Sequence, residues 1–219
     1  MKFINIHTHK PRNSEHIVEV NNLFLQDVDS FPDRGLYSVG LHPWHISNDE
    51  DSIREHFVNL EKLIVQSRLL MVGECGLDRF HEIVINQQIP VFIEHLVLAQ
   101  HYEKPVLIHS VKAVSDIISI RNKLRISVPF IFHGYNGNEE MTQQLMKNET
   151  YFSFGAALLT IKSLQDIFKE IPTNRIFLET DDSDIDIERI YEIAASILSI
   201  SIEKLKVVIN DNFTELFYK

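Results

Sequence analysis

The sequence predicts an α/β protein, a compact (β/α)8 TIM barrel, on three observations. Short apolar runs rich in β-branched and aromatic residues alternate with longer amphipathic segments along the chain. Alternating strands and helices indicate a parallel sheet with right-handed crossovers. Histidines and acidic residues follow several of these runs, at the strand ends where barrel enzymes carry their catalytic loops. A typical barrel has about 250 residues, so 219 residues would form a small one.

The predicted strands are short runs that are too brief to form stable helices. They cover residues 2–6, 36–41, 69–73, 105–108, 129–132, 151–154, 175–178 and 206–209. The predicted helices each place apolar residues on one face, as Ile53, Phe57 and Leu60 do in the first. They cover residues 51–66, 90–102, 111–124, 138–147, 161–170 and 185–199. A doubly wound open sheet is the alternative, but the sequence has no Gly-rich nucleotide-binding loop to favour it.

Length and composition set further limits on the protein. We expect residues 1–219 to form a single domain, because 219 residues are short for two. One cysteine, Cys75, excludes an internal disulfide and a thiolate metal cluster. The start of the chain lacks the layout of a signal peptide, and no stretch approaches the roughly 18 apolar residues of a membrane span. We therefore expect a cytoplasmic protein that does not bind membranes.

The formal net charge of −10 argues against a broad nucleic-acid-binding surface, which relies on many Lys and Arg contacts. It leaves room for a pocket that takes one phosphate, because bound cations reverse the local field. The 11 histidines are more informative than the net charge, because several of them stand at predicted strand ends.

The candidate ligands come from separate segments that each end a predicted strand. His7 and His9 are two residues apart, so a strand would present both imidazoles on one side. The other strand-end candidates are His42, Glu74, His109, His133 and Asp181. This set of nitrogen and oxygen donors suits Zn²⁺, Mn²⁺, Fe²⁺ or Ni²⁺, and Mg²⁺ less obviously. Six or seven ligands exceed the four of one tetrahedral zinc, so we expect two ions about 3.5–4 Å apart that share a carboxylate.

Each candidate also has a structural interpretation. A single His at a strand end is more often a hydrogen-bonded core or rim residue than a ligand. Glu74 lies between Gly73 and Gly76 and could be a turn carboxylate, while Asp184 and Asp186 fit a solvated acidic loop before a helix. The joint pattern favours a metal site, because the structural interpretations would all have to hold at matched strand ends.

The ordered motifs resemble the TatD family of metal-dependent deoxyribonucleases and related hydrolases, within the amidohydrolase-like barrels. The resemblance runs through nearly the whole chain, and Gly73-Glu74-Cys75-Gly76-Leu77-Asp78 is its most specific stretch. The other matching motifs are Ile6-His7-Thr8-His9, Gly40-Leu41-His42-Pro43, Gln88-x-x-x-Phe92-x-x-His95, Ile108-His109, His133-Gly134-Tyr135, Leu178-Glu179-Thr180-Asp181 and Asn212-Phe213.

By this resemblance, His7, His9 and Asp181 hold one ion, Glu74 bridges, and His109 and His133 hold the second. The implied reaction is cleavage of DNA phosphodiester bonds by a water that two divalent cations activate, with Asp181 as general base and Glu74 as the second catalytic carboxylate. His42, Lys112 and Tyr135 are the candidate substrate contacts, and Glu179 and Asp78 are expected to support the ligands.

Three departures from the family pattern affect the substrate pocket rather than the ligands. Val111 stands where the family commonly has Arg, with Lys112 next, and a guanidinium and an ammonium are not equivalent at a phosphate. Trp44 replaces a second His, and the loop after Asp181 is short. The alternatives are therefore a dinuclear hydrolase of a small ester, lactone or amide, and a non-catalytic metal-binding barrel. The substrate is DNA or a small ester, and no obligate protein partner is evident.

Overall fold

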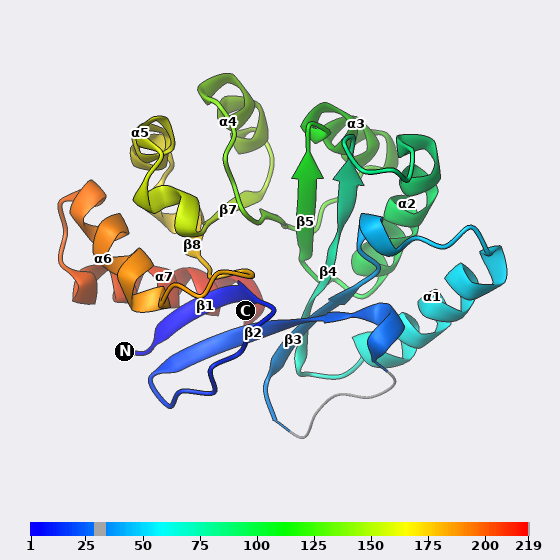
Figure 1. Cartoon of the computed structure of the whole chain (residues 1–219), viewed down its shortest axis with the longest axis horizontal. Helices are drawn as coiled ribbons and strands as arrows, with labels where there is room; N and C mark the ends of the chain where they lie inside the picture. Colours follow the sequence, from blue (N-terminus) through cyan, green and yellow to red (C-terminus); the bar gives the residue numbers. More distant parts are fainter. Residues whose placement is uncertain (29–33, 219) are drawn as a thin grey trace. The chain divides into compact units, whose positions relative to one another are not determined.

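The computed structural model describes residues 1–28 and 34–218, in which strands and helices alternate for most of the chain (Figure 1). Eight strands are ordered in the sheet as they are in the chain, from β1 to β8. The pairs β1–β2, β3–β4, β4–β5 and β7–β8 are all parallel. This is the topology of the (β/α)8 class, so the predicted fold class is confirmed.

The described chain divides into two units, which we treat separately. The central unit, Asn22–Ile131, carries three complete strands and three α-helices. Its elements are β3 (Leu36–Gly40), α1 (Glu50–Ile64), β4 (Leu69–Asp78), α2 (Ile85–His101), β5 (Val106–Val111) and α3 (Val114–Leu124), with the 3-10 turns η1 (Leu25–Asp27) and η2 (Pro43–His45). Every residue of β4 is buried, as expected for a parallel strand covered on both faces.

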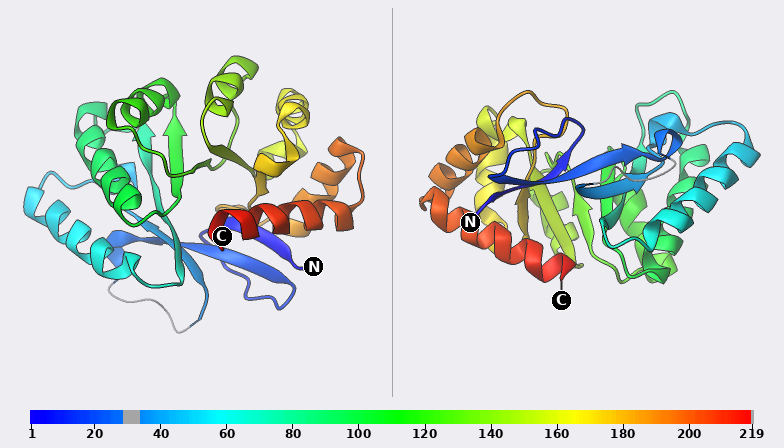
Figure 2. Two further views of the ribbon diagram at one scale, coloured as in Figure 1. Left: turned by 180° about the vertical axis from the view of Figure 1, so that it is seen from behind. Right: turned by 90° about the horizontal axis from the view of Figure 1, so that it is seen from below.

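The terminal unit combines Met1–Asn21 with Phe132–Lys219. Its elements are β1 (Phe3–Thr8), α4 (Glu139–Met146), β7 (Thr150–Phe154), α5 (Lys162–Glu170), β8 (Ile176–Leu178), α6 (Ile187–Leu198) and α7 (Ile202–Phe217), with η3 (Ala156–Leu159) and η4 (Thr173–Arg175). The unit boundaries fall inside β2 (Ile17–Phe24) and β6 (Phe130–Phe132). Figure 2 shows α7 alongside β1, and the hydroxyl of Tyr191 in α6 bonds both the N–H and the carbonyl of Ile4 in β1, each at 3.1 Å.

Two strand assignments from the sequence need correction. Residues 206–209, predicted as the last strand, lie inside α7, where Leu205, Ile209 and Phe213 recur at helical spacing and are buried. The strand β2 was not predicted from the sequence. It follows β1 after a loop without a helix, in a stretch (residues 7–35) for which neither a strand nor a helix was predicted. The strands that carry the later ligands therefore each move up by one in number.

Glycine allows the strands of the central unit to approach closely beside Glu74. Gly76 has a φ of +154°, and a Cβ there would lie 1.9 Å from the carbonyl oxygen of His109 in the neighbouring strand β5. Gly73 has a φ of +127°, and its Cβ would lie 2.4 Å from the carbonyl oxygen of Leu107. Only glycine tolerates both the backbone angle and the contact. The sequence predicted a strand that ends at residue 73, with Glu74 after it. In the structure β4 continues to Asp78, so Glu74 lies inside the strand.

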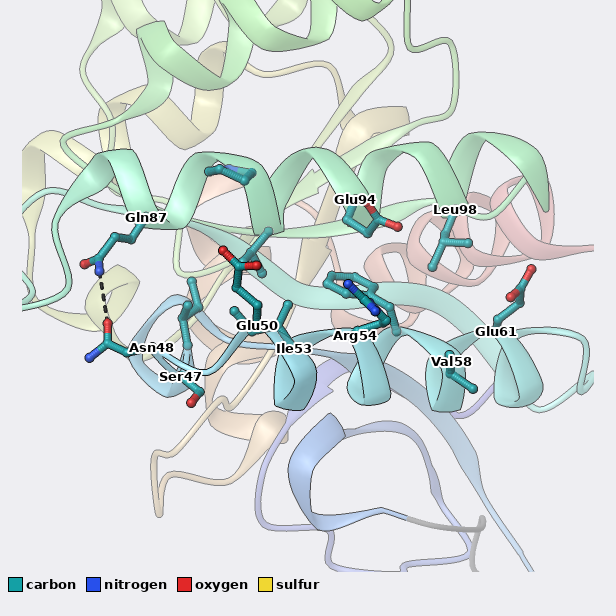
Figure 3. A pocket seen from close by; sticks show the side chains of 14 residues that line it. Ser47, Asn48, Glu50, Ile53, Arg54, Val58, Glu61, Gln87, Glu94 and Leu98 are labelled. Atoms are coloured by element: carbon teal, nitrogen blue, oxygen red, sulfur yellow. Dashed lines mark hydrogen bonds between the residues drawn. The ribbon is translucent and has the colours of Figure 1, made fainter.

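A groove of about 560 Å³ lies between α1 and α2 on the central unit (Figure 3). Ile53, Phe57 and Leu98 give it apolar walls, and Glu50 and Glu94 stand along it. Its lining residues include none of the candidate ligands. Helix α2 starts at Ile85, five positions before the predicted start at Pro90, so this proline lies within the helix.

Candidate metal centre

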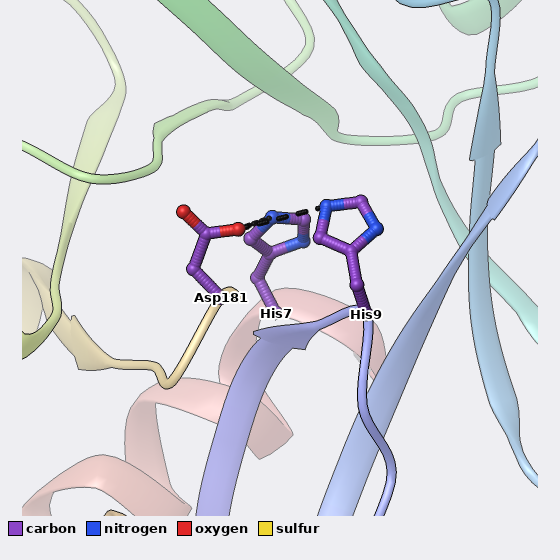
Figure 4. A group of neighbouring side chains, drawn as sticks. All are labelled: His7, His9 and Asp181. Carbon is purple, nitrogen blue, oxygen red and sulfur yellow. Dashed lines mark ion pairs between the residues drawn. The ribbon is translucent and has the colours of Figure 1, made fainter. Parts of the chain in front are cut away.

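The terminal unit brings together three of the predicted ligands, His7, His9 and Asp181 (Figure 4). The Nε2 atom of His7 lies 3.3 Å from Oδ1 of Asp181, and Nε2 of His9 lies 3.6 Å from the same oxygen. His7 is fully buried, whereas His9 and Asp181 are partly exposed. The three side chains therefore converge on one point that solvent can reach.

Backbone and side-chain hydrogen bonds hold Asp181 against β1. The N–H of Asp181 donates to the His7 carbonyl at 3.1 Å, and the N–H of His9 donates to the Asp181 carbonyl at 3.2 Å. The amide of Asn5 bonds the neighbouring Thr180 twice, through Nδ2 to Oγ1 at 2.8 Å and through Oδ1 from the Thr180 N–H at 3.0 Å. Asp181 has a φ of +52°, a left-handed conformation that aspartate adopts more readily than most residues.

His133 belongs to the same unit and extends this group. Its ring centroid lies 4.7 Å from that of His7, and His133, Glu179 and Asp181 also form a possible ligand triplet. Glu179 is fully buried, accepts a 2.5 Å hydrogen bond from the Gly134 N–H and a short one from the Ser153 hydroxyl, and lies 3.7 Å from Nδ1 of His133. A buried carboxylate with these contacts orients the His133 segment.

The central unit holds a second ligand group, His42, Glu74 and His109. Oε1 of Glu74 lies 3.1 Å from Nε2 of His42 and 2.9 Å from Nδ1 of His109. All three side chains are buried. His42 was expected to contact substrate, but the structure places its imidazole on Glu74 as a third potential ligand.

Buried polar side chains fix this second group. Oδ1 of Asn22 accepts hydrogen bonds from the Glu74 N–H at 2.8 Å and from the Ser38 hydroxyl at 2.9 Å. His95 is fully buried in α2, and its Nε2 accepts a 2.9 Å hydrogen bond from the N–H of Leu41, next to His42. Burial lowers the pKa of His95 to about 4, although the Val91 carbonyl acts in the opposite direction.

Besides His95, His42 and Asp78 of the central unit have shifted pKa values. Burial lowers the pKa of His42 and outweighs the attraction of Glu74, so this imidazole is neutral at pH 7 and its nitrogen can accept a metal or a proton. Burial alone would raise the pKa of Asp78. Hydrogen bonds from Trp44 and the Phe80 N–H, together with His109, outweigh that effect, and the Asp78 pKa lies below its usual value.

The donors and their spacing both fit divalent cations. Zinc–ligand bonds of about 2.1 Å at a tetrahedral angle separate two ligand atoms by roughly 3.4 Å. The nitrogen–oxygen distances in the two groups run from 2.9 to 3.6 Å. Imidazole and carboxylate are the donors that zinc, manganese and iron accept. Each unit therefore offers a group suited to one ion.

The remaining predicted substrate contacts differ in their surroundings. Lys112 follows β5, is exposed, and could reach a ligand. Tyr135 is 4% exposed, its hydroxyl lies 2.7 Å from that of Thr142, and burial raises its pKa. Its hydroxyl and ring thus brace the segment after β6, which favours a structural role over a substrate contact.

The acidic loop after Asp181 is paired rather than merely solvated. Lys10 bonds the Asp182 carbonyl at 2.7 Å and the Asp184 carboxylate at 3.1 Å, and Arg12 pairs with Asp186. These contacts fasten the loop to the segment that follows His9. They also occupy the two cations nearest to His9 in sequence.

Histidines and carboxylates at the ends of parallel strands of a β/α barrel define a class of metal-dependent hydrolases. Residues 3–218 match the family described as TatD related DNase. The chain belongs to this family and is a metal-dependent hydrolase.

Relatives of this chain carry names at different levels of detail. An uncharacterized metal-dependent hydrolase, YcfH of Escherichia coli, is 25% identical over 215 residues, which cover 90% of this chain and 78% of that protein. YabD of Bacillus subtilis, also an uncharacterized metal-dependent hydrolase, is 29% identical over 63% of this chain and 56% of its own length. A protein of Schizosaccharomyces pombe named deoxyribonuclease Tat-D is 24% identical over 66% of this chain and 50% of that protein.

Solved structures share the fold. The TatD homologue YJJV of Escherichia coli has a TM-score of 0.83 at 17% identity and covers 99% of this chain and 98% of its own. A TatD-family hydrolase of Entamoeba histolytica has a TM-score of 0.80, also at 17% identity, with the same coverage. In the part of the chain that the structure describes, no helix is both long and apolar enough to cross a membrane.

Proposed function

We propose that this protein hydrolyses phosphodiester bonds of DNA with the help of two divalent cations. The observation that carries the proposal is the pair of ligand groups, each with nitrogen and oxygen donors at the spacing that one ion requires. The family match and the relative named deoxyribonuclease Tat-D support DNA as the substrate. We place the reaction in the cytoplasm, because a protein with a single, buried cysteine cannot form an internal disulfide and so fits a reducing compartment.

The ligands divide between the two ions. By the family resemblance, His7, His9 and Asp181 would hold the first ion, and Glu74, His109 and His133 would hold the second, with Glu74 shared. When bound, such ions act as Lewis acids toward a phosphoryl oxygen and lower the pKa of a water. Their charge also offsets the net charge of −10 that would repel a phosphate.

The chain's own side chains orient and deprotonate the attacking water. Oδ1 of Asp181 faces both His7 and His9, while the side chain remains 39% exposed, so it can accept a proton from a water that enters from solvent. Asn5 and Thr180 keep this carboxylate in place. Neutral His42 adds a nitrogen that can bind an ion or hydrogen-bond to the substrate.

The test of the proposed function compares two substrate classes. Purified protein is stripped with EDTA, reloaded with Zn²⁺, Mn²⁺, Ni²⁺ or Mg²⁺, and assayed on single-stranded DNA and on a panel of small esters and lactones. We expect DNA cleavage that EDTA abolishes. If only small esters are cleaved, the nuclease assignment is wrong. If nothing is cleaved and elemental analysis finds no ion, the result favours a non-catalytic barrel.

Hydrolysis of a small ester, lactone or amide is the second candidate. Two features favour it: Val111 stands where the family resemblance implies an arginine, and Tyr135 is buried against Thr142. Both features reduce the number of side chains that can bind a phosphate. The metal ligands would be the same, so the substrate panel distinguishes the two candidates.

Replacing Glu74 tests the shared carboxylate. We expect Glu74→Ala to lose both ions, or one ion and nearly all activity, because the carboxylate oxygen faces His42 and His109 and is assigned to both metals. Metal content by elemental analysis and folding by circular dichroism measure this. Full activity with two bound ions would show that Glu74 does not bridge.

A further inference from the structure

Exposed aromatic side chains stand beside the second ligand group on the central unit. Phe80 is 78% exposed and Trp44 is 49% exposed. The rings of Trp44 and His81 are stacked, with centroids 5.5 Å apart and planes inclined by 11°. We call Trp44, Phe80 and His81 the aromatic platform.

One carboxylate holds the platform in position. The indole Nε1 of Trp44 donates to Oδ2 of Asp78 at 2.7 Å, and the backbone N–H of Phe80 donates to Oδ1 at 2.7 Å. Hydrogen bonds from the Asp78 N–H to Gln88 at 2.7 Å and from Gln88 back to the Asp78 carbonyl at 2.8 Å fix Asp78 itself. The Trp44 ring and the Phe80 backbone are therefore held by a buried network.

The same network reaches the candidate ligands. Oδ2 of Asp78 lies 3.6 Å from Nε2 of His109, and the Trp44 ring meets the rings of His42 and His109 edge-on, with centroids 4.9 and 5.8 Å apart. The Trp44 ring therefore lies directly against two of the imidazoles assigned to metal binding.

A cation stands close to the platform. Lys112 is exposed and follows Val111, which is paired with Asp78 in the β4–β5 ladder, and the N–H of Arg79 bonds the Val111 carbonyl at 3.1 Å. Arg79 itself is engaged with Asp116 through contacts of 2.7 and 3.1 Å. Lys112 is therefore the side chain here that can meet a phosphate, while the rings meet a flat apolar face.

We propose that the aromatic platform stacks on an unpaired nucleobase next to the phosphodiester bond that is cleaved, with Lys112 on the neighbouring phosphate. The inference rests on the proposed function and specifies its substrate as single-stranded DNA or a frayed end. Stacking on aromatic side chains binds bases of any identity, because every base has a π-face. A base in a closed duplex offers no free face, so the platform selects unpaired nucleotides.

The single tryptophan of the chain is Trp44, which makes its fluorescence a direct probe of the platform. Stopped-flow mixing of metal-loaded protein with a short thymidine oligonucleotide reads both Trp44 emission and cleavage. The comparison substrate is the same oligonucleotide with abasic nucleotides. We expect quenching by the thymidine strand before turnover, little quenching by the abasic strand, and a higher KM for the abasic strand.

Phe80→Ala separates stacking from structural support, because Phe80 is too exposed to contribute much to folding. Loss of one stacked base raises the KM for the thymidine strand by about 5- to 150-fold, with an unchanged kcat and an unchanged KM for the abasic strand. Val84→Ala, at a 58% exposed apolar residue near the start of α2, is the matched control and leaves both KM values unchanged.

Three results overturn the proposal: constant Trp44 emission at strand concentrations that saturate cleavage, equal KM values of wild-type protein for the two strands, and a Phe80→Ala defect that is the same for both. Failure of the proposed function gives a different result. If the thymidine strand quenches Trp44 fluorescence but no metal-loaded protein cleaves it, base stacking on the platform is supported and the nuclease assignment is wrong.

Discussion

The side chain of Asn5 connects strand β1 to the segment that carries Asp181. Its amide donates to and accepts from Thr180, whose hydroxyl in turn donates to that of Thr8 at 3.0 Å. We expect Asn5→Ala to lower the free energy of unfolding by about 1–3 kcal/mol, because a buried N–H and a hydroxyl lose their partner. Metal affinity should fall about 10- to 100-fold, as for other groups that orient ligands. Urea unfolding and competition with a chelator measure the two effects.

Asn210→Ala is the matched control for this substitution. Asn210 also donates to the backbone near β1, to the Lys2 carbonyl at 2.9 Å, but it lies on α7 and contacts no ligand segment. Its loss should leave metal affinity unchanged. Equal losses of metal affinity in the two variants would remove the case for a specific role of Asn5.

Residue chemistry explains which parts of the site the sequence could reveal. Histidines and acids at strand ends stand out, so His7, Glu74 and Asp181 were predicted from their positions alone. Asn5 and Asn22 were not predicted, because a single asparagine carries no pattern that separates a buried brace from a surface turn. Asn22 was further hidden by the missed strand β2, which places it beside Glu74.

At the scale of an element, the sharpest constraint is the close approach of β4 to β5. We expect Gly76→Ala to destabilise the protein by about 4 kcal/mol or more, because the new Cβ meets the His109 carbonyl at a backbone angle that alanine avoids. The same shift would displace His109 and lower metal content. Thermal unfolding and elemental analysis measure both.

Gly155→Ala provides the comparison on the terminal unit. A Cβ at Gly155 would be 3.6 Å from its nearest neighbours on Glu179, an ordinary contact, and the φ of this residue is −107°. The cost should stay below about 1 kcal/mol. If Gly155→Ala destabilised the protein as much as Gly76→Ala, the loss of stability would follow from replacing any glycine and not from the contact between β4 and β5.

The element assignments failed where local pattern and tertiary context disagree. Residues 206–209 contain two β-branched valines and an isoleucine, which favour a strand in a short window, but the longer window has the period of a helix. The strand β2 mixes buried and partly exposed residues without regular alternation and includes Glu19, Asn21 and Asn22. Its polar content hid it, because the other strands are almost continuously apolar.

For the whole molecule, buried His95 predicts a loss of stability in acid. Its pKa is about 4 in the fold against 6.5 for the free side chain, so the folded protein holds it neutral. The contribution is fully present above pH 6.5 and is lost as the pH falls toward 4, because the unfolded chain binds the proton first. Between pH 7 and pH 5 this amounts to about 2 kcal/mol. Urea unfolding at the two pH values measures it.

His95→Gln identifies the histidine as the source of this pH dependence. Glutamine can accept from the Leu41 N–H but does not titrate, so the difference in stability between pH 7 and pH 5 should shrink. An unchanged difference would assign the acid sensitivity to other groups, such as His42, whose lowered pKa acts in the same direction and in the same pH range.

The pairing of β1 with the segment around Asp181 has a consequence for synthesis in the cell. His7 leaves the ribosome early, but Asp181, with which it shares a ligand group, follows 174 positions later along the chain. Tyr191 and α7, which secure β1, emerge later still. A nascent chain therefore cannot assemble this ligand group until the segment that carries Asp181 has been synthesised.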